Sequence, residues 1–140
     1  MFDNIVIVFF TVENTESVYT MAFSIAKKFE SKVDILKCIY KEPPRFVVYE
    51  TKSEKAKNAK KFEDAQNSLK VLENIAGESK ISIKTQVDFT EELSEHVIKF
   101  VKAHKVDLLI MDTHQHHDGE ENKDLVNRIY QEIDCPLLTL

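Results

Sequence analysis

Short apolar segments alternate along this chain with longer segments whose apolar residues recur every three or four positions. The short segments have the length of buried strands, and the longer ones have the period of helices that lie on a sheet. Such alternation is typical of a parallel sheet, because each parallel strand pair needs a crossover connection. The expected strands span residues 4–10, 32–40, 81–89, 106–112 and 135–140, and the expected helices span 16–29, 53–76, 91–104 and 125–133.

The polarity of each strand predicts its place in the sheet. Segments 4–10 and 106–112 are apolar almost throughout, which favours central strands covered on both faces. Segment 81–89 alternates apolar and polar residues, which suits an edge strand, and 135–140 is expected at the other edge. Right-handed crossovers then predict a doubly wound α/β sandwich, a five-stranded parallel sheet with helices on both faces. We expect one domain, residues 1–140, with its ligand crevice where the two central strands end.

Residue chemistry at the helix ends predicts where the helices start and stop. Gly77 is expected to end the second helix, Thr90 to cap the third and Asp124 to cap the fourth. Pro43 and Pro44 predict an irregular stretch after the second strand. The stripes expected to face the sheet are Val18, Ala22, Ile25 and Phe29; Phe62, Ala65, Leu69, Leu72 and Ala76; Leu93, Val97, Phe100, Val101 and His104; and Leu125, Val126, Ile129 and Ile133.

Composition excludes several classes of protein. Hydrophobic residues make up 43% and charged residues 31% of the 140 residues, the balance of a soluble globular protein. The net charge of −5 argues against a nucleic-acid binder. The longest apolar runs are too short to span a bilayer, and no basic residues precede the first, so we expect a cytoplasmic protein without membrane association. Cys38 and Cys135 show no C-x-x-C spacing and are expected to be reduced.

Three stretches carry a family resemblance: "AFSIAKKF" leading into "SKVDILKCIY", the strand "VDLLIMDTH", and the closing "IDCPLLTL". In this order and spacing they resemble the universal stress proteins of the UspA type, over essentially the whole chain. The resemblance implies the sheet order 3-2-1-4-5 and a homodimer. It also implies a crevice where some members bind ATP, through an aspartate that ends the first strand and a loop G-x-x-G-x9-G-[ST] after the fourth.

The chain departs from this nucleotide pattern. The aspartate position falls on Phe10, the first two loop glycines on Asp112 and Gln115, and the final Gly-Ser pair on Lys123 and Asp124. Side chains at glycine positions hinder the close approach of backbone N–H groups to phosphates, and an acidic loop repels a triphosphate. We therefore expect no ATP binding in the family's manner and no cofactor. The candidate crevice residues are Phe10, Thr11, Val12, Tyr40, Asp112, Thr113, His114, Lys123 and Asp124.

The loop after the fourth strand contains His114, His116 and His117 between Asp112 and Asp118. Imidazole and carboxylate groups suit zinc or nickel, but three histidines within four positions of one polar loop do not easily converge on an ion. We expect a solvated loop with weak, adventitious metal affinity and no specific metal site. His104, at the end of a helix, is expected to satisfy backbone carbonyls there.

Two functional hypotheses follow. The first is a small regulatory or interaction module of the universal stress type, a homodimer through the C-terminal edge strand "PLLTL" without nucleotide chemistry and open to a further, unidentified protein partner. The second is a domain that still binds an adenine nucleotide or another small ligand in the crevice, for which Lys123 offers a phosphate contact. The run "KSEKAKNAKK" is either a patch for an acidic partner or a solvated helix start. No catalytic motif is recognisable, so no enzyme is expected.

Overall fold

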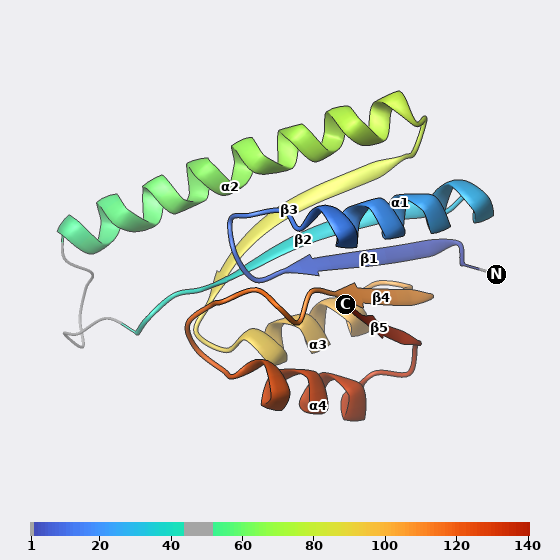
Figure 1. Cartoon of the computed structure of the whole chain (residues 1–140). Helices are drawn as coiled ribbons and strands as arrows, with labels where there is room; N and C mark the ends of the chain where they lie inside the picture. The colour runs from blue at the N-terminus through green and yellow to red at the C-terminus, as the bar shows by residue number, and fades with distance from the viewer. Residues whose placement is uncertain (1, 44–51) are drawn as a thin grey trace.

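The structure is a computed structural model that describes residues 2–43 and 52–140. Nine elements follow one another within these residues (Figure 1). They are β1 (Asn4–Phe9), α1 (Glu16–Phe29), β2 (Lys32–Tyr40), α2 (Lys52–Glu78), β3 (Ile83–Thr90), α3 (Leu93–Ala103), β4 (Leu108–Met111), α4 (Asn122–Glu132) and β5 (Leu137–Thr139). Pro43 lies outside the helices and strands, as expected, and Pro44 lies outside the described residues.

The strands form one parallel sheet in the order β3-β2-β1-β4-β5. Both the fold class and the order inferred above are confirmed. From β1 to β3, each new strand is added on the same side of the sheet. After β3 the chain crosses back, and β4 pairs with the opposite edge of β1. A crevice is therefore expected where β1 and β4 end side by side, because their following loops turn to opposite faces.

Strand β1 is buried on both faces. Ile5, Ile7 and Phe9 pack into a cluster with α1 and α2, whereas Val6 and Val8 pack into a second cluster with α3 and α4. The two helical layers are visible on opposite sides of the sheet in Figure 1. This confirms the prediction that the apolar strands lie at the centre and the alternating and short strands at the edges.

Most predicted stripe residues are buried, but Phe29, Phe62 and His104 are exposed. Phe29 and Phe62 expose 37% and 38% of their surface, and each ring still has an aromatic neighbour: Phe2 at 5.3 Å and Phe89 of β3 at 6.2 Å between ring centroids. Phe23 and Ala26 are buried in α1 instead. In α2, the buried residues are Ala65, Leu69, Leu72 and Ala76, all in its second half.

Three predicted helix ends are wrong. Gly77 stays within α2, and the chain turns only at Lys80, where φ is 59°. Thr90 belongs to β3; its hydroxyl accepts a hydrogen bond from the Glu92 N–H at 3.0 Å and stabilises the turn before α3 rather than the helix itself. Asp124 lies in the first turn of α4, whose N-cap is Glu121. Tertiary packing moved these ends by one to three residues.

Among the described residues, no helix is both long enough and apolar enough to cross a membrane. The two cysteines are free; Cys38 is buried in β2 and Cys135 is partly exposed before β5.

Candidate functional site

Two loops meet where β1 and β4 end. The first, residues 10–15, connects β1 to α1, and the second, residues 112–121, connects β4 to α4. They line a cavity of about 530 Å³ on one side and one of about 210 Å³ on the other. The first cavity is lined by Thr11, Val12, Glu13, Thr15, Asp112, His114, Gln115 and His116. This is the crevice that the sheet topology predicts.

Gln115 joins the two loops across the crevice. Its Oε1 accepts a hydrogen bond from the Phe10 N–H at 3.0 Å, and its Nε2 donates to the Glu13 carbonyl at 2.9 Å. The side chain is 9% exposed, so these bonds lie largely out of water. The backbone N–H that follows β1 is therefore already occupied by a side chain of the same protein.

Asp112 holds the ends of both loops. Its carboxylate accepts hydrogen bonds from the Thr15 hydroxyl and from the His114 N–H, the latter at 2.8 Å. The residue is only 2% exposed. A buried carboxylate with two donors is satisfied internally, and it places negative charge beside the crevice.

Phe10 carries no charge into the crevice. It is 2% exposed and packs with the cluster that α3 and α4 cover. Its ring lies 5.3 Å from the His117 ring, centroid to centroid, at an interplanar angle of 40°. The position that bears an aspartate in the nucleotide pattern is thus filled by an aromatic contact within the protein.

Lys37 holds the first loop through hydrogen bonds from its side-chain amine. It is fully buried in β2, and its Nζ donates to the carbonyls of Thr11, Val12 and Glu13 at 3.3, 2.6 and 3.2 Å. Burial lowers the pKa of this amine to about 7, and the nearby Glu13 carboxylate opposes that shift. Three consecutive carbonyls turned toward one amine fix the loop conformation.

Tyr40 ends β2 and packs against the second loop. Gly119 has a φ of 94°, and a Cβ at this position would lie 2.8 Å from Tyr40 Cδ2. Only glycine fits both the backbone conformation and the space. The loop therefore lies flat on the tyrosine ring at this point.

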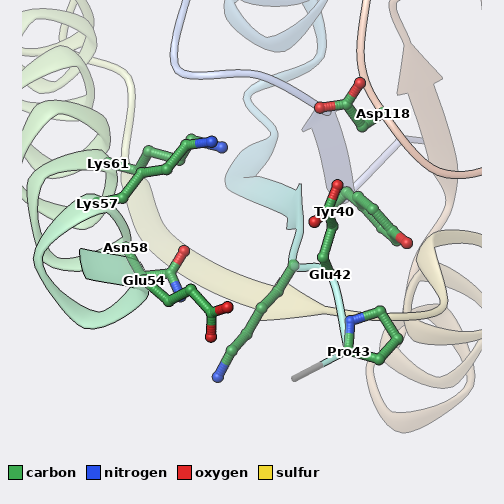
Figure 2. A pocket seen from close by; sticks show the side chains of 9 residues that line it. Tyr40, Glu42, Pro43, Glu54, Lys57, Asn58, Lys61 and Asp118 are labelled. Atoms are coloured by element: carbon green, nitrogen blue, oxygen red, sulfur yellow. The ribbon is translucent and has the colours of Figure 1, made fainter. Parts of the chain in front are cut away.

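The 210 Å³ cavity opens beside Tyr40 and is lined by Phe10, Thr11, Val12, Ile39, Tyr40, Lys61, His116, His117 and Asp118. An adjoining small cavity of about 80 Å³ lies between the end of β2 and the start of α2. Figure 2 shows Lys57 and Lys61 extending from α2 on one side of it, with Tyr40 and Asp118 on the other. Lys61 lines both of these cavities and brings positive charge to the crevice.

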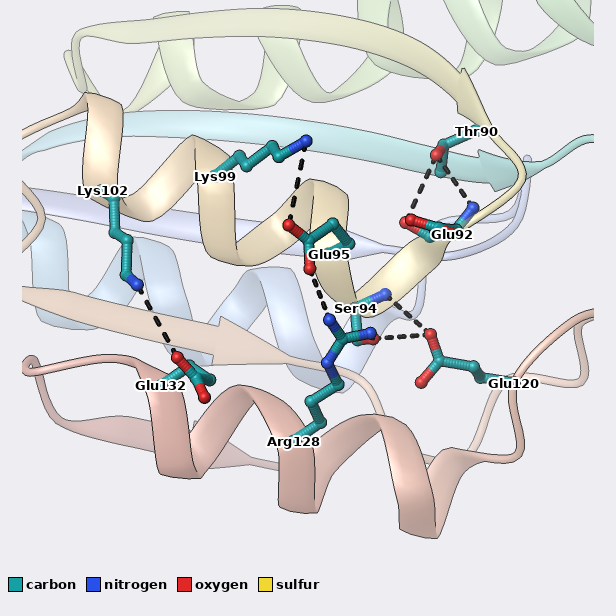
Figure 3. Close-up of polar contacts among 9 residues, drawn as sticks. All are labelled: Thr90, Glu92, Ser94, Glu95, Lys99, Lys102, Glu120, Arg128 and Glu132. Carbon is teal, nitrogen blue, oxygen red and sulfur yellow. Dashed lines mark hydrogen bonds and ion pairs between the residues drawn. The ribbon is translucent and has the colours of Figure 1, made fainter.

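The second loop is also anchored at its two ends. Thr113 donates its N–H and its hydroxyl to the Leu140 carbonyl, both at 2.9 Å. Glu120 accepts the Ser94 N–H at 3.1 Å and the Ser94 hydroxyl at 2.6 Å, at the start of α3 (Figure 3). Arg128 of α4 donates to the same Ser94 hydroxyl at 3.0 Å and pairs with Glu95.

Six of the nine candidate crevice residues line the two cavities: Phe10, Thr11, Val12, Tyr40, Asp112 and His114. Thr113 is their neighbour in the chain but lines neither cavity, and its hydroxyl bonds to the Leu140 carbonyl. Lys123 and Asp124 do not join them. Both are exposed in the first turn of α4, and neither lines the two crevice cavities. The capping expected of Asp124 is wrong, because the N-cap of α4 is Glu121. The phosphate contact of Lys123 stays a prediction.

Five residues that organise the crevice were not predicted to do so: Lys37, Lys61, Gln115, Gly119 and Asn122. For Lys37 the sequence offered a signal, since a lysine interrupts an otherwise apolar strand. His104 does contact a carbonyl, with its Nδ1 2.8 Å from the Phe100 oxygen, as expected. In the described part of the chain, no three His, Cys, Asp or Glu side chains are arranged to hold a metal ion.

Comparison with known proteins identifies a protein family and solved structures to which this chain is similar. The model described as "Universal stress protein family" matches residues 1–140. No curated protein sequence is similar enough to count as a relative. The fold is similar to a universal stress family protein from Burkholderia pseudomallei (TM-score 0.74, 11% identity, covering 99% of this chain and 96% of that one). It is equally similar to UspA from Lactobacillus plantarum (TM-score 0.74, 14% identity, 99% and 97% covered).

A further similar structure is the universal stress protein from Archaeoglobus fulgidus in complex with dAMP (TM-score 0.60, 8% identity, 99% and 97% covered). At these identities the similarity concerns the fold. The family match, by contrast, extends over the whole chain.

Proposed function

The chain belongs to the universal stress protein family, and from this premise we propose that it is a stress-response regulatory module that does not bind ATP in the family's manner. Membership supports a role in stress response and a binding module rather than an enzyme. The residues of the crevice support the absence of nucleotide chemistry.

One observation carries the proposal: the Gln115 side chain occupies the backbone groups that a ligand would use. A nucleotide entering between the loops would have to break the bonds from Gln115 to the Phe10 N–H and to the Glu13 carbonyl. Each bond contributes about 1 kcal/mol, and leaving a buried partner unpaired costs about 1–3 kcal/mol. The adjacent Asp112 carboxylate also repels phosphate.

Together these effects oppose binding by several kcal/mol. Because each 1.4 kcal/mol changes a dissociation constant about tenfold, a micromolar site would weaken to about millimolar. Calorimetric titration with Mg-ATP and, separately, with Mg-AMP tests this. We expect no binding in the low micromolar range for either nucleotide.

Gln115→Gly provides the matched variant. It frees the Phe10 N–H and the Glu13 carbonyl while leaving Asp112, Lys37 and Tyr40 in place. We expect it to bind nucleotide more tightly than the unmodified protein. Low-micromolar ATP binding by the unmodified protein would contradict the proposal.

A second function is favoured by a different observation. The 210 Å³ cavity combines the aromatic ring of Tyr40, apolar walls and the cationic Lys61, which suits a small anionic or aromatic ligand. Mass spectrometry of small molecules that co-purify with the native protein discriminates between the two functions. A stoichiometric ligand that is lost in Lys61→Ala would support this second function.

We propose a homodimer that forms through β5. This strand is three residues long and, among the described residues, pairs with β4 alone, so its outer edge is open to a symmetry mate. The Leu140 N–H points toward β4, where it bonds the Met111 carbonyl at 3.1 Å, so by alternation the Thr139 N–H points outward.

Thr139→Pro therefore removes one donor from the outer edge without removing a bond to β4. Leu138→Lys is a harsher change, since Leu138 also packs into the core. Analytical ultracentrifugation at micromolar concentration is expected to show a dimer that Thr139→Pro weakens. A monomeric unmodified protein, or a dimer indifferent to both changes, would contradict this interface.

We also propose a cytoplasmic protein that binds neither nucleic acid nor membranes. The net charge of −5 supports this, because phosphate-rich surfaces repel an acidic protein. Fractionation of cells that express the protein, together with a nucleic-acid mobility shift at low salt, tests both parts.

A further inference from the structure

His117 lies in the middle of the second loop, and both of its ring nitrogens meet oxygen atoms. Nε2 is 2.6 Å from the Asn122 side-chain oxygen, and Nδ1 is 3.0 Å from the Asp118 carbonyl oxygen. A carbonyl oxygen only accepts hydrogen bonds. The role of the Asn122 oxygen depends on how its amide is oriented.

Two other contacts fix that orientation. Asn122 Nδ2 donates to the Thr113 carbonyl at 2.9 Å and to the Gln115 carbonyl at 3.2 Å. Rotating the amide by half a turn would place its oxygen against these two carbonyl oxygens and lose both bonds. The Asn122 oxygen therefore faces His117 as an acceptor.

Both ring nitrogens of His117 must then donate to satisfy their partners. A neutral imidazole carries one N–H, and only the doubly protonated ring carries two. The cationic form makes both bonds, whereas the neutral form loses one and leaves a nitrogen lone pair facing an oxygen.

The Phe10 ring supports the same form. The two ring centroids are 5.3 Å apart, and Phe10 is buried. A cation near an aromatic face is attracted to it, and the attraction is stronger where water is excluded. The Phe10 ring therefore stabilises the cationic form of His117 more than its neutral form.

The charges around His117 act in both directions. Lys61 of α2 lines the same cavity and opposes a second positive charge, as does the N-terminus of α4, which begins at Asn122. Asp118 of the loop favours it. His116 and Tyr40 also line the cavity, while β1 contributes the uncharged Phe10. With these effects opposed, hydrogen bonding determines which form the folded loop prefers.

We propose that His117 is a pH-dependent latch on residues 113–122. When doubly protonated it ties the loop to α4 and covers Phe10. When neutral it releases one of its two bonds, and the loop moves more freely over the 210 Å³ cavity. Histidine is the side chain whose change of charge is used in protein pH switches, which makes pH the variable that tests the latch.

The latch controls the mobility of the loop over the crevice. Only its biological use rests on the proposed function. Its test needs no ligand. A failure of the latch and a failure of the nucleotide prediction are therefore separate results.

The test is amide hydrogen exchange of residues 113–122, followed by NMR at pH 5.5 and 7.5 and expressed as protection factors to remove the intrinsic effect of pH. We expect protection about tenfold greater at pH 5.5. The ring ¹⁵N shifts of His117 are expected to show both nitrogens protonated at the lower pH. Amides of β1 serve as an internal reference that pH should not change.

His116→Gln is the matched control, because its ring lies next to His117 but is exposed. It should keep the pH dependence, and His117→Gln should abolish it. An equal pH dependence in His117→Gln overturns the latch. So does a neutral His117 ring at pH 5.5 in the unmodified protein, a result that needs no variant.

Discussion

Replacing Lys37 with methionine removes a buried charge while keeping most of the side-chain volume. The amine lies beneath the first crevice loop, 5.0 Å from the Phe9 ring centroid, and donates to three carbonyls. Burial lowers its pKa from 10.5 to about 7, despite the opposing attraction of Glu13. The unfolded chain has no such burial, so the two states bind protons differently.

This difference sets the pH dependence of stability. Between pH 7 and 10.5 the unfolded chain holds a proton on Lys37 that the folded chain has released. The free energy of unfolding therefore rises with pH, at most by about 1.4 kcal/mol per unit. This contribution is smallest below pH 7, where the folded protein carries the buried charge.

Cys38 acts in the opposite direction. Burial raises the pKa of its thiol well above the ordinary range, so the folded chain keeps a proton that the unfolded chain loses above about pH 9. Both the unmodified protein and Lys37→Met contain Cys38. The difference between them therefore isolates the lysine.

Urea unfolding followed by circular dichroism at pH 7.5 and 9 measures that difference. We expect the stability of the unmodified protein relative to Lys37→Met to increase by about 2 kcal/mol over this range. Lys84→Met, which changes an exposed lysine of β3, should leave the pH profile parallel to that of the unmodified protein. Parallel profiles for Lys37→Met would refute the reasoning.

Three further predictions concern stability and metal. Gly119→Ala is expected to lower the free energy of unfolding by about 1–3 kcal/mol, because φ is 94° and the new Cβ would meet the Tyr40 ring. Gly77 lies inside α2 with open space around it, so Gly77→Ala is expected to raise the free energy of unfolding by about 0.5–1 kcal/mol. Equal urea midpoints for the two variants would contradict this assignment. Arg128→Ala is expected to lower the free energy of unfolding by no more than about 1 kcal/mol, since the ion pair with Glu95 is half exposed. A much larger loss of stability in the same urea assay would show that the Ser94 contact matters more than the ion pair. Zinc is expected to leave the melting temperature nearly unchanged, and a strong rise that disappears when His116 and His117 are both changed to alanine would show a specific site.

The sequence predicted the arrangement of the elements well because burial acts on whole segments. A strand covered on both faces must be apolar throughout, as β1 is, and a strand with one wet face must alternate, as β3 does. Together with right-handed crossovers, these patterns leave few topologies. Helix ends were less certain, because a single cap contributes only about 1 kcal/mol, and packing can override it.

The crevice depended on contacts that no local pattern encodes. Gln115 bonds to Phe10, 105 positions away, and its place in the sequence showed only that it was not glycine. The bonds that orient Asn122, and through it both nitrogens of His117, likewise exist only once the loop has closed onto α4. A polar side chain has several possible partners, and only the folded chain selects among them. The sequence by itself thus determined the parallel sheet, its two edge strands and the position of the crevice, because these follow from the burial of apolar surface, whereas the full strand order was implied by the family resemblance. The tertiary structure alone decided what fills the crevice, because directional hydrogen bonds depend on distances that folding sets.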